Sequence, residues 1–332
     1  MANAAMQRQR RLLALAALAG LSLAGLGLGA AGPAIAQPAP FSEEPTRYRS
    51  NKPYQSEVER EQRRRDEEAG ARPDSPLTVT GGVDFRNQYF FRGYNYVSSG
   101  LIAQPYLVAG YSVYKDPDLA ITPHGGAWFD LTEQSSHREP GEKQSITHVR
   151  EFRGDLGVAL EVHKFVFDFQ YVFYNSPAEA FSDTHEIGVD VRYDDRAAWR
   201  DKPFLSGLNP TFSLFYEARD ERDDDYNTFV GVGIEPALKS FEVGRLPVTV
   251  SFPVTVGGSY DGYYKDADGH NSNFGYWEAG VRAALPLGRS VFGLSWSLDA
   301  EVDYVNLMAR SARAANGFDD SDIVFRIGLA FR

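Results

Sequence analysis

From Leu77 to the end of the chain, hydrophobic and polar residues alternate with a period of two. The stretch Phe165–Tyr174 carries aromatic and aliphatic side chains on one face and the polar residues Asp168 and Gln170 on the other. The last eleven residues repeat the pattern: Arg326 and Gly328 share one face, and the opposite face holds Ile323, Phe325, Ile327, Leu329 and Phe331. Successive side chains of a strand point to opposite faces, so this period predicts strands with one apolar face.

Twelve such segments follow one another, which predicts an all-β fold. An even number of antiparallel strands, with apolar residues facing outward, is typical of a transmembrane up-and-down β-barrel. In a closed barrel the first segment must pair with the last. The predicted strands are Leu77–Phe91, Leu101–Tyr114, Leu119–Leu131, Val149–Val162, Phe165–Tyr174, His185–Tyr193, Thr211–Ala218, Asn227–Leu238, Leu246–Val256, Tyr276–Leu285, Val291–Tyr304 and Asp322–Arg332.

The connections between these segments alternate in length. Four of the five that follow an even-numbered segment are short (115–118, 163–164, 239–245 and 286–289), and 194–210 is longer. Long connections occur at the other end, at 132–147, 257–275 and 306–321. Short periplasmic turns and long outer loops are the pattern of outer-membrane barrels. A soluble β-sandwich also alternates, but it does not require a charged second face in strand after strand.

Aromatic residues gather near the predicted ends of the strands, as expected for a membrane interface. The sequence predicts an outer group at Tyr89, Tyr171, Trp277 and Tyr304, and an inner group at Tyr111, Phe165, Tyr193 and Phe331. Lipid of the outer membrane is therefore an expected partner.

The second face of the strands predicts a lumen in which acidic residues outnumber arginines. The expected lumen-lining residues are Asp84, Arg86, Arg92, Asp130, Arg153, Asp155, Asp168, Glu186, Asp190, Arg192, Glu278, Arg282, Asp299, Glu301, Asp303 and Arg326, and the same parity adds His124, Glu161, Glu217 and Glu235. A water-filled lumen of this charge would favour small cations and other small solutes. Alternatively, these charges pair with one another and fill a non-conducting structural or adhesive barrel.

The residues before the strands divide into two segments. Residues 1–36 resemble a secretory signal, with Arg8, Arg10 and Arg11 before an uncharged Leu/Ala/Gly run and a small-residue site at Ala34–Ala36. Residues 37–75 are charged, rich in proline and without apolar periodicity, which predicts a disordered periplasmic arm. The barrel then occupies 76–332 in the outer membrane of a Gram-negative-type bacterium.

Composition excludes several kinds of function. The chain has no cysteine, so it has neither disulfides nor thiolate metal sites. The net charge of −11 falls to −14 without residues 1–36, because three arginines and no acid lie there, and this disfavours nucleic acid as a partner. No nucleotide-binding glycine loop is present, and the segment 266–269 lacks both end ligands of a calcium loop. We therefore expect no cofactor and no metal.

An outer-membrane hydrolase is the rival class of function. It would need a serine, a histidine and an acid at the outer rim. The residues of these types near predicted outer strand ends are Ser145, His148, Ser182, Asp183 and His185. Neighbours on one strand do not make a triad, so the expectation is that the protein is not an enzyme.

Several short motifs resemble the TorF / conserved-hypothetical "Gcw_chp" family of predicted bacterial outer-membrane barrels. The similarity covers about residues 77–332 and rests on the stretch 86–93 (RNQYFFRG), the Gln104–Pro105 pair, the stretch 125–129 (GGAWF) and the aromatic strand Phe165–Tyr174. It implies an outer-membrane barrel inserted by the barrel-assembly machinery, and it implies no activity. Members of that family commonly end on an aromatic residue, whereas here Arg332 follows Phe331.

Overall fold

The computed structural model describes residues 75–98, 100–132, 148–178, 181, 183–219, 227–243, 246–289 and 294–332. The predicted signal segment 1–36 and all but the last residue of the arm 37–75 lie outside these residues. In the described part of the chain, no helix is long and apolar enough to cross a membrane. That finding concerns helices only.

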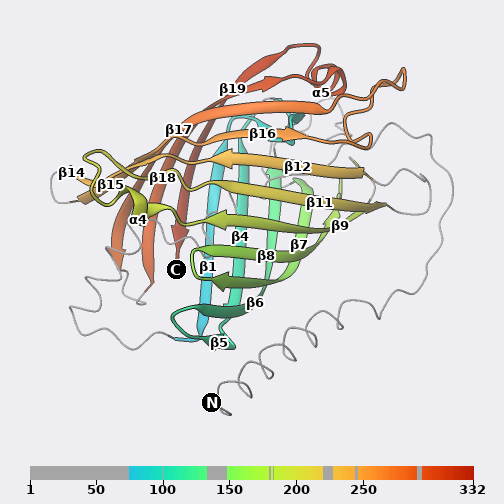
Figure 1. Ribbon diagram of the computed structural model, residues 1–332. Coiled ribbons are helices and arrows are strands. Elements are labelled where there is room, and N and C mark those ends of the chain that lie inside the picture. The colour runs from blue at the N-terminus through green and yellow to red at the C-terminus, as the bar shows by residue number, and fades with distance from the viewer. Residues whose placement is uncertain are drawn as a thin grey trace. The chain divides into compact units, whose positions relative to one another are not determined.

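The described residues form strands β1 to β19 and the short helices α4 and α5 (Figure 1). The strands are β1 (Leu77–Arg86), β2 (Tyr89–Phe91), β3 (Tyr94–Val97), β4 (Ile102–Tyr111), β5 (Tyr114–Lys115), β6 (Leu119–Thr132), β7 (His148–Val162), β8 (Phe165–Asn175), β9 (Thr184–Tyr193), β10 (Leu205–Gly207), β11 (Thr211–Arg219), β12 (Asn227–Ile234), β13 (Ala237–Leu238), β14 (Phe241–Val243), β15 (Leu246–Ser251), β16 (Val254–Gly258), β17 (Phe274–Arg289), β18 (Ser295–Leu307) and β19 (Ser321–Phe331). The helices are α4 (Arg196–Trp199) and α5 (Arg310–Ala315).

The long strands pair in chain order into a closed antiparallel barrel. The wall runs β1, β4, β6, β7, β8, β9, β11, β12, β15 with β16, β17, β18 and β19, and then returns to β1. Counting β15 and β16 as one, this is the predicted twelve-strand barrel, and the fold class is confirmed. The remaining short strands extend the wall at the end that carries the short connections, which we call the turn end. The exceptions are β2 and β3, which form a sheet of their own.

The first and last strands close the barrel. Gly81 pairs with Phe331, Val83 with Leu329 and Phe85 with Ile327, as the sequence required. Closure matters because an unpaired strand edge in hydrocarbon would leave backbone N–H and C=O groups without partners, each at a cost of several kcal/mol.

Several boundaries differ from the sequence prediction, among them the second strand, which the structure divides into β4 and β5, and the eighth, which it divides into β12 and β13. The first strand ends at Arg86 and not at Phe91, because the chain leaves the wall and turns back as the β2–β3 hairpin. The ninth is split into β15 and β16 at Phe252–Pro253, where proline offers no N–H to the ladder. The segment Pro286–Arg289, expected to be a turn, continues β17 with a register shift between Pro286 and Gly288.

The closing seam yields a prediction. A Cβ at Gly328 would overlap the carboxylate of Asp84 across the seam, so Gly328→Val should weaken the pairing of β1 with β19 and destabilise the barrel by about 1–3 kcal/mol. The measurement is the urea concentration at which the protein loses the gel mobility of the folded barrel, which heating also abolishes. Ile327→Val, one residue away on the outward face, is the matched control and should behave as the wild type.

Candidate functional site

The two faces of the barrel wall differ sharply in exposure. Outward positions carry exposed apolar side chains, such as Leu107, Leu156, Val302 and Ile327, the last of which is 57% exposed. Inward positions of the same strands carry polar and charged side chains that are mostly buried. The charged interior is therefore the candidate functional site.

Most of the predicted lumen residues are buried inside this barrel. The buried ones are Arg86, Arg92, Asp130, Arg153, Asp155, Asp168, Glu186, Asp190, Arg282, Asp299, Glu301, Asp303 and Arg326. Asp84, Arg192 and Glu278 are partly exposed. A side chain that lines an open aqueous pore stays accessible to water, so burial of this extent means that the interior is filled at these levels.

The closing strand contributes an arginine that is paired on both sides. Arg326 donates from Nη1 to Asp84 on β1 at 2.9 Å and from Nε to Glu301 on β18 at 3.0 Å. Arg282 on β17 lies 3.7 Å from Glu235 and 3.9 Å from Asp299, measured between nitrogen and oxygen. The interior arginines on this side thus hold neighbouring strands together as counter-charges.

A chain of hydrogen bonds crosses the opposite wall. His124 Nε2 lies 2.7 Å from Asp168, and the amide of Gln170 donates to Asp168 at 3.1 Å and to Asp190 at 3.0 Å. Ser213 donates to Asp190 at 2.6 Å. This chain links β6, β8, β9 and β11, and it satisfies carboxylates that are almost completely buried.

The hairpin β2–β3 folds into the barrel and is the main feature that the sequence pattern did not reveal. Tyr89 was predicted to belong to the outer aromatic girdle, but it is 1% exposed and packs against Trp128 of β6. Phe91 packs against Tyr174 of β8. The period of two continues from β1 into the hairpin, so parity alone could not show that the chain had left the wall.

The hairpin spans the lumen. Its turn residue Gly93 has a φ of +82° and lies so close to Tyr276 of β17 that a Cβ there would be 2.9 Å from the Tyr276 Cβ. Contacts with β6, β8 and β17 place the hairpin against widely separated parts of the wall. We call the hairpin (Tyr89–Val97) together with its two covering tyrosines, Tyr263 and Tyr264, the plug.

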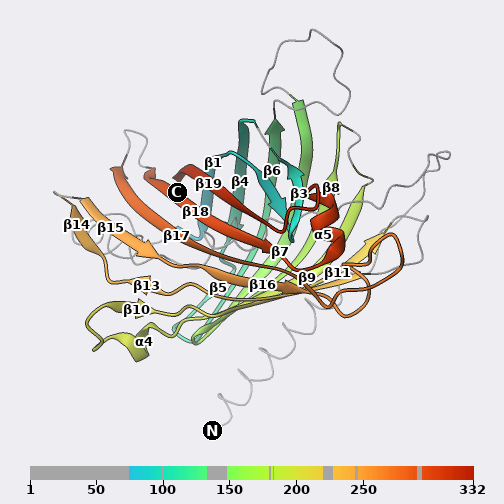
Figure 2. The same ribbon diagram turned by 90° about the horizontal axis from the view of Figure 1, so that it is seen from above.

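Two segments at the same end of the barrel, the connection that carries Tyr263 and Tyr264 and the helix α5, hold the hairpin in place. Tyr264 stacks on Tyr94 with ring centroids 5.8 Å apart, and the Tyr94 hydroxyl donates to the backbone oxygen of Tyr263 at 3.1 Å. The same hydroxyl contacts Ser311 of α5 at 3.2 Å. Figure 2 accordingly shows β3 beside α5. Sequence reasoning missed both tyrosines because the connection 259–273 has no regular period.

Arg92 connects the plug to the far wall. It occupies the hairpin turn at a φ of +44° and is 2% exposed. Its guanidinium donates two hydrogen bonds to Glu186 of β9, at 2.7 and 3.1 Å, and lies 4.2 Å from the ring centre of Phe229 on β12. Arg92 was expected on the wall beside Arg86; the structure places it on an inserted hairpin instead.

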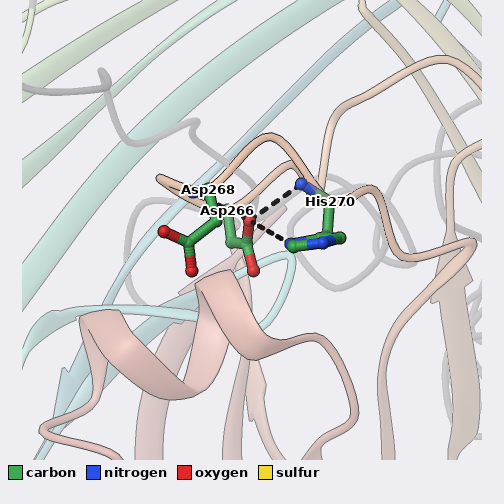
Figure 3. Close-up of side chains that lie close together, drawn as sticks. All are labelled: Asp266, Asp268 and His270. Carbon is green, nitrogen blue, oxygen red and sulfur yellow. Dashed lines mark hydrogen bonds and ion pairs between the residues drawn. The ribbon is translucent and has the colours of Figure 1, made fainter.

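The residues Asp266, Asp268 and His270 form the one described cluster with metal-ligand geometry (Figure 3). The Asp266 carboxylate accepts the backbone N–H groups of Asp268 at 3.0 Å and His270 at 2.9 Å. Arg310 of α5 contacts Asp266 at 3.4 Å and Asp268 at 3.1 Å. A positive charge is already present, so the cluster serves as a link between the connection and α5.

The residues considered for a hydrolase are only partly described. Ser145, Ser182 and the side chain of His148 lie outside the described residues. His185 contacts the Tyr171 hydroxyl at 2.6 Å, and Asp183 accepts a hydrogen bond from Asn175 at 2.7 Å. These contacts of His185 and Asp183 thus involve a tyrosine hydroxyl and an asparagine amide.

No family model matches the chain, and no curated protein matches it. Its fold is similar to that of several solved barrels. The COG4313 outer membrane channel from Pseudomonas putida F1 is 9% identical, with a TM-score of 0.43, over 78% of this chain and 96% of that one. The β domain of the Bordetella autotransporter BrkA is 10% identical, with a TM-score of 0.40, over 78% and 99%. The NanC porin is 12% identical, with a TM-score of 0.37, over 77% and 100%. At these levels the likenesses assign neither a substrate nor a mechanism.

The buried arginine pairs yield a stability prediction. Arg326→Met would leave Asp84 and Glu301 without their shared counter-charge, so unfolding should become easier by about 3–5 kcal/mol. Urea unfolding followed by tryptophan fluorescence measures this. Lys115→Met, at an exposed position of the short strand β5, should change the free energy of unfolding by less than about 0.5 kcal/mol.

The Asp266 link yields a pH prediction. The His270 N–H that donates to Asp266 holds the pKa of that carboxyl below its ordinary value, and Arg310 adds to the effect. A lowered pKa means that the link is intact above about pH 4 and is lost only as the pH falls through that lowered value. Hydrogen exchange should show the Asp268 and His270 amides protected from pH 7 to 5, whereas Asp266→Asn should reduce the protection at every pH.

Proposed function

We propose that this protein is an outer-membrane β-barrel that forms a cation-leaning channel closed at its loop end by the plug. Its apolar outward face, with side chains such as Leu156 and Ile327 exposed, supports a location in lipid. Its acidic interior supports a preference for cations. The sequence left a conducting lumen and a filled one as alternatives, and the proposal combines a conducting barrel with a lumen that is closed while the plug is in place.

The observation that carries the proposal is the position of the hairpin. One short two-stranded element contacts Trp128, Tyr174, Glu186 and Tyr276, which belong to four different wall strands. Among the described residues β2 and β3 pair only with each other, so the ladder of the described wall strands does not depend on the hairpin. The hairpin is therefore the element whose departure would open the lumen with the least loss of structure.

A non-conducting structural or adhesive barrel is the second candidate. It is favoured by the paired charges inside the wall, since the Asp84–Arg326–Glu301 group and the chain from His124 to Ser213 fill space even without the hairpin. The two candidates differ in what remains when the plug is removed.

Planar-bilayer conductance separates them. Wild-type barrels should be nearly silent, and replacing Tyr89–Val97 by a glycine–serine linker should raise the mean conductance at least about tenfold, with reversal potentials that indicate cation preference. The matched control replaces the segment 239–245, which includes the short strand β14 at the end opposite the plug, and should stay silent.

Three results would count against the proposed channel. Steady large currents through the wild type would show that the plug does not close it. Silence of the linker variant, with the barrel still shifted by heat on a gel, would leave the structural barrel as the function. A preference for anions would contradict the proposed role of the acidic interior.

A further inference from the structure

The guanidinium of Arg92 sits in a pocket built from wall residues and one tyrosine of the plug. We define the Arg92 pocket as Glu186, Tyr174, Phe215, Phe229 and Tyr263. We propose that this pocket is a recognition site for guanidinium-bearing solutes, and that the protein's own arginine occupies it while the barrel is closed.

The pocket has the chemistry that selects a planar cation. Glu186 accepts two nearly parallel N–H groups through its two oxygens, at 2.7 and 3.1 Å, which is the geometry that distinguishes guanidinium from ammonium. The Tyr174 hydroxyl donates to the same carboxylate at 3.0 Å and so fixes its orientation. The acceptor is therefore in place before any cation arrives.

Aromatic rings surround the cation in addition. The guanidinium carbon lies 4.2 Å from the ring centre of Phe229, 5.3 Å from that of Phe215 and 5.2 Å from that of Tyr263. Rings at these distances attract a cation through their negative faces, and more strongly when water is excluded. A carboxylate among rings also disfavours neutral solutes of the same shape, because Glu186 would then stay buried without a counter-charge.

Arg92 and most of the residues of its pocket belong to different elements of the structure. Arg92 is carried by the turn of the β2–β3 hairpin, whereas Tyr174, Glu186, Phe215 and Phe229 belong to β8, β9, β11 and β12. These four strands are paired with one another in the wall. The wall part of the pocket therefore persists when the hairpin leaves, and Tyr263 belongs to the connection between β16 and β17, not to the hairpin.

The other interior arginines with described ion pairs differ in this respect. Arg326 and Arg282 are carried by the wall strands β19 and β17, next to their carboxylate partners on neighbouring strands. They cannot leave without a change in the wall itself. Arg92 is thus placed as an exchangeable cation, and a solute that binds Glu186 in its place would shift the population toward the unplugged barrel.

Binding can be measured directly on a variant that empties the pocket. Arg92→Ala, folded in detergent, would be titrated calorimetrically with arginine, with its neutral isostere citrulline and with lysine. We expect saturable binding of arginine, at least about tenfold tighter than that of citrulline or lysine, because only the guanidinium offers both the charge and two parallel donors. In Arg92→Ala/Glu186→Gln, arginine binding should weaken at least about tenfold.

Arg326→Ala is the matched control, since it also removes a buried interior arginine that is paired with carboxylates. It should bind arginine at least about tenfold more weakly than Arg92→Ala does, because Asp84 Oδ1 and Glu301 Oε2 meet that guanidinium from two different strands, whereas Glu186 receives two N–H groups on the two oxygens of one carboxylate. Equal binding by both variants would show that any emptied arginine cavity takes up the solute and would overturn the proposal.

A second variant keeps the test decisive if Arg92→Ala does not fold. Gly93→Ala retains every residue of the pocket but strains the hairpin turn, where φ is +82° and Tyr276 is close. It should bind arginine at least about tenfold more tightly than the wild type does, because the hairpin competes less. Folded variants that bind no arginine, or that bind citrulline equally well, would overturn the proposal.

The inference rests on the proposed function only in that the hairpin must be separable from the wall. Calorimetry measures the binding of arginine independently of any current, and conductance measures the opening of the barrel independently of any bound solute. A barrel that binds arginine but never conducts would support the binding site and contradict the channel. A barrel that conducts without the plug but does not bind arginine would support the channel and contradict the binding site.

Discussion

Closure of the hydrogen-bond ladder between β1 and β19 is the constraint on which the rest of the structure depends. A barrel wall in lipid has no water to satisfy an open edge, so the first and last strands must meet in register. In that register Asp84 lies beside Gly328 and within reach of Arg326, which also reaches Glu301 on the next strand. The seam is therefore joined twice, by the backbone outside and by an arginine with two carboxylates inside.

The charged interior of the barrel is a consequence of the same closure in lipid. Since one face of every strand is given to apolar side chains, the charged residues are forced inward, where they are kept only if they find partners. Arg282, Arg326 and the chain from His124 to Ser213 show how the wall supplies these partners strand by strand. At the loop end the partners are aromatic, and the hairpin supplies the largest share of them.

The strands of the wall could be predicted from the sequence, whereas the plug could not. Period-two alternation located the twelve wall strands, most within a few residues, because lipid on one face and charge on the other leave a repeating signal. The hairpin has the same period but the opposite environment, so Tyr89 and Phe91 looked like lipid-facing residues. The sequence did offer a local clue, because Gly93 stands between Arg92 and Tyr94 and glycine favours the positive φ of a tight turn, which the structure shows at both Arg92 and Gly93. Tyr263 and Tyr264 lie in an irregular connection and gave no periodic signal.

The two ends of the interior are unequal in a way that gives the barrel a direction. Asp168 and Glu186 are almost fully buried, whereas Glu161 is exposed and Glu235 and Arg192 are partly exposed toward the short turns. Charged side chains of the interior therefore reach solvent at the turn end, whereas at the loop end the interior is covered by the buried tyrosines of the plug. In the closed state that we propose, the charged groups at the turn end are the part of the interior that responds to the ionic strength of the surrounding solution.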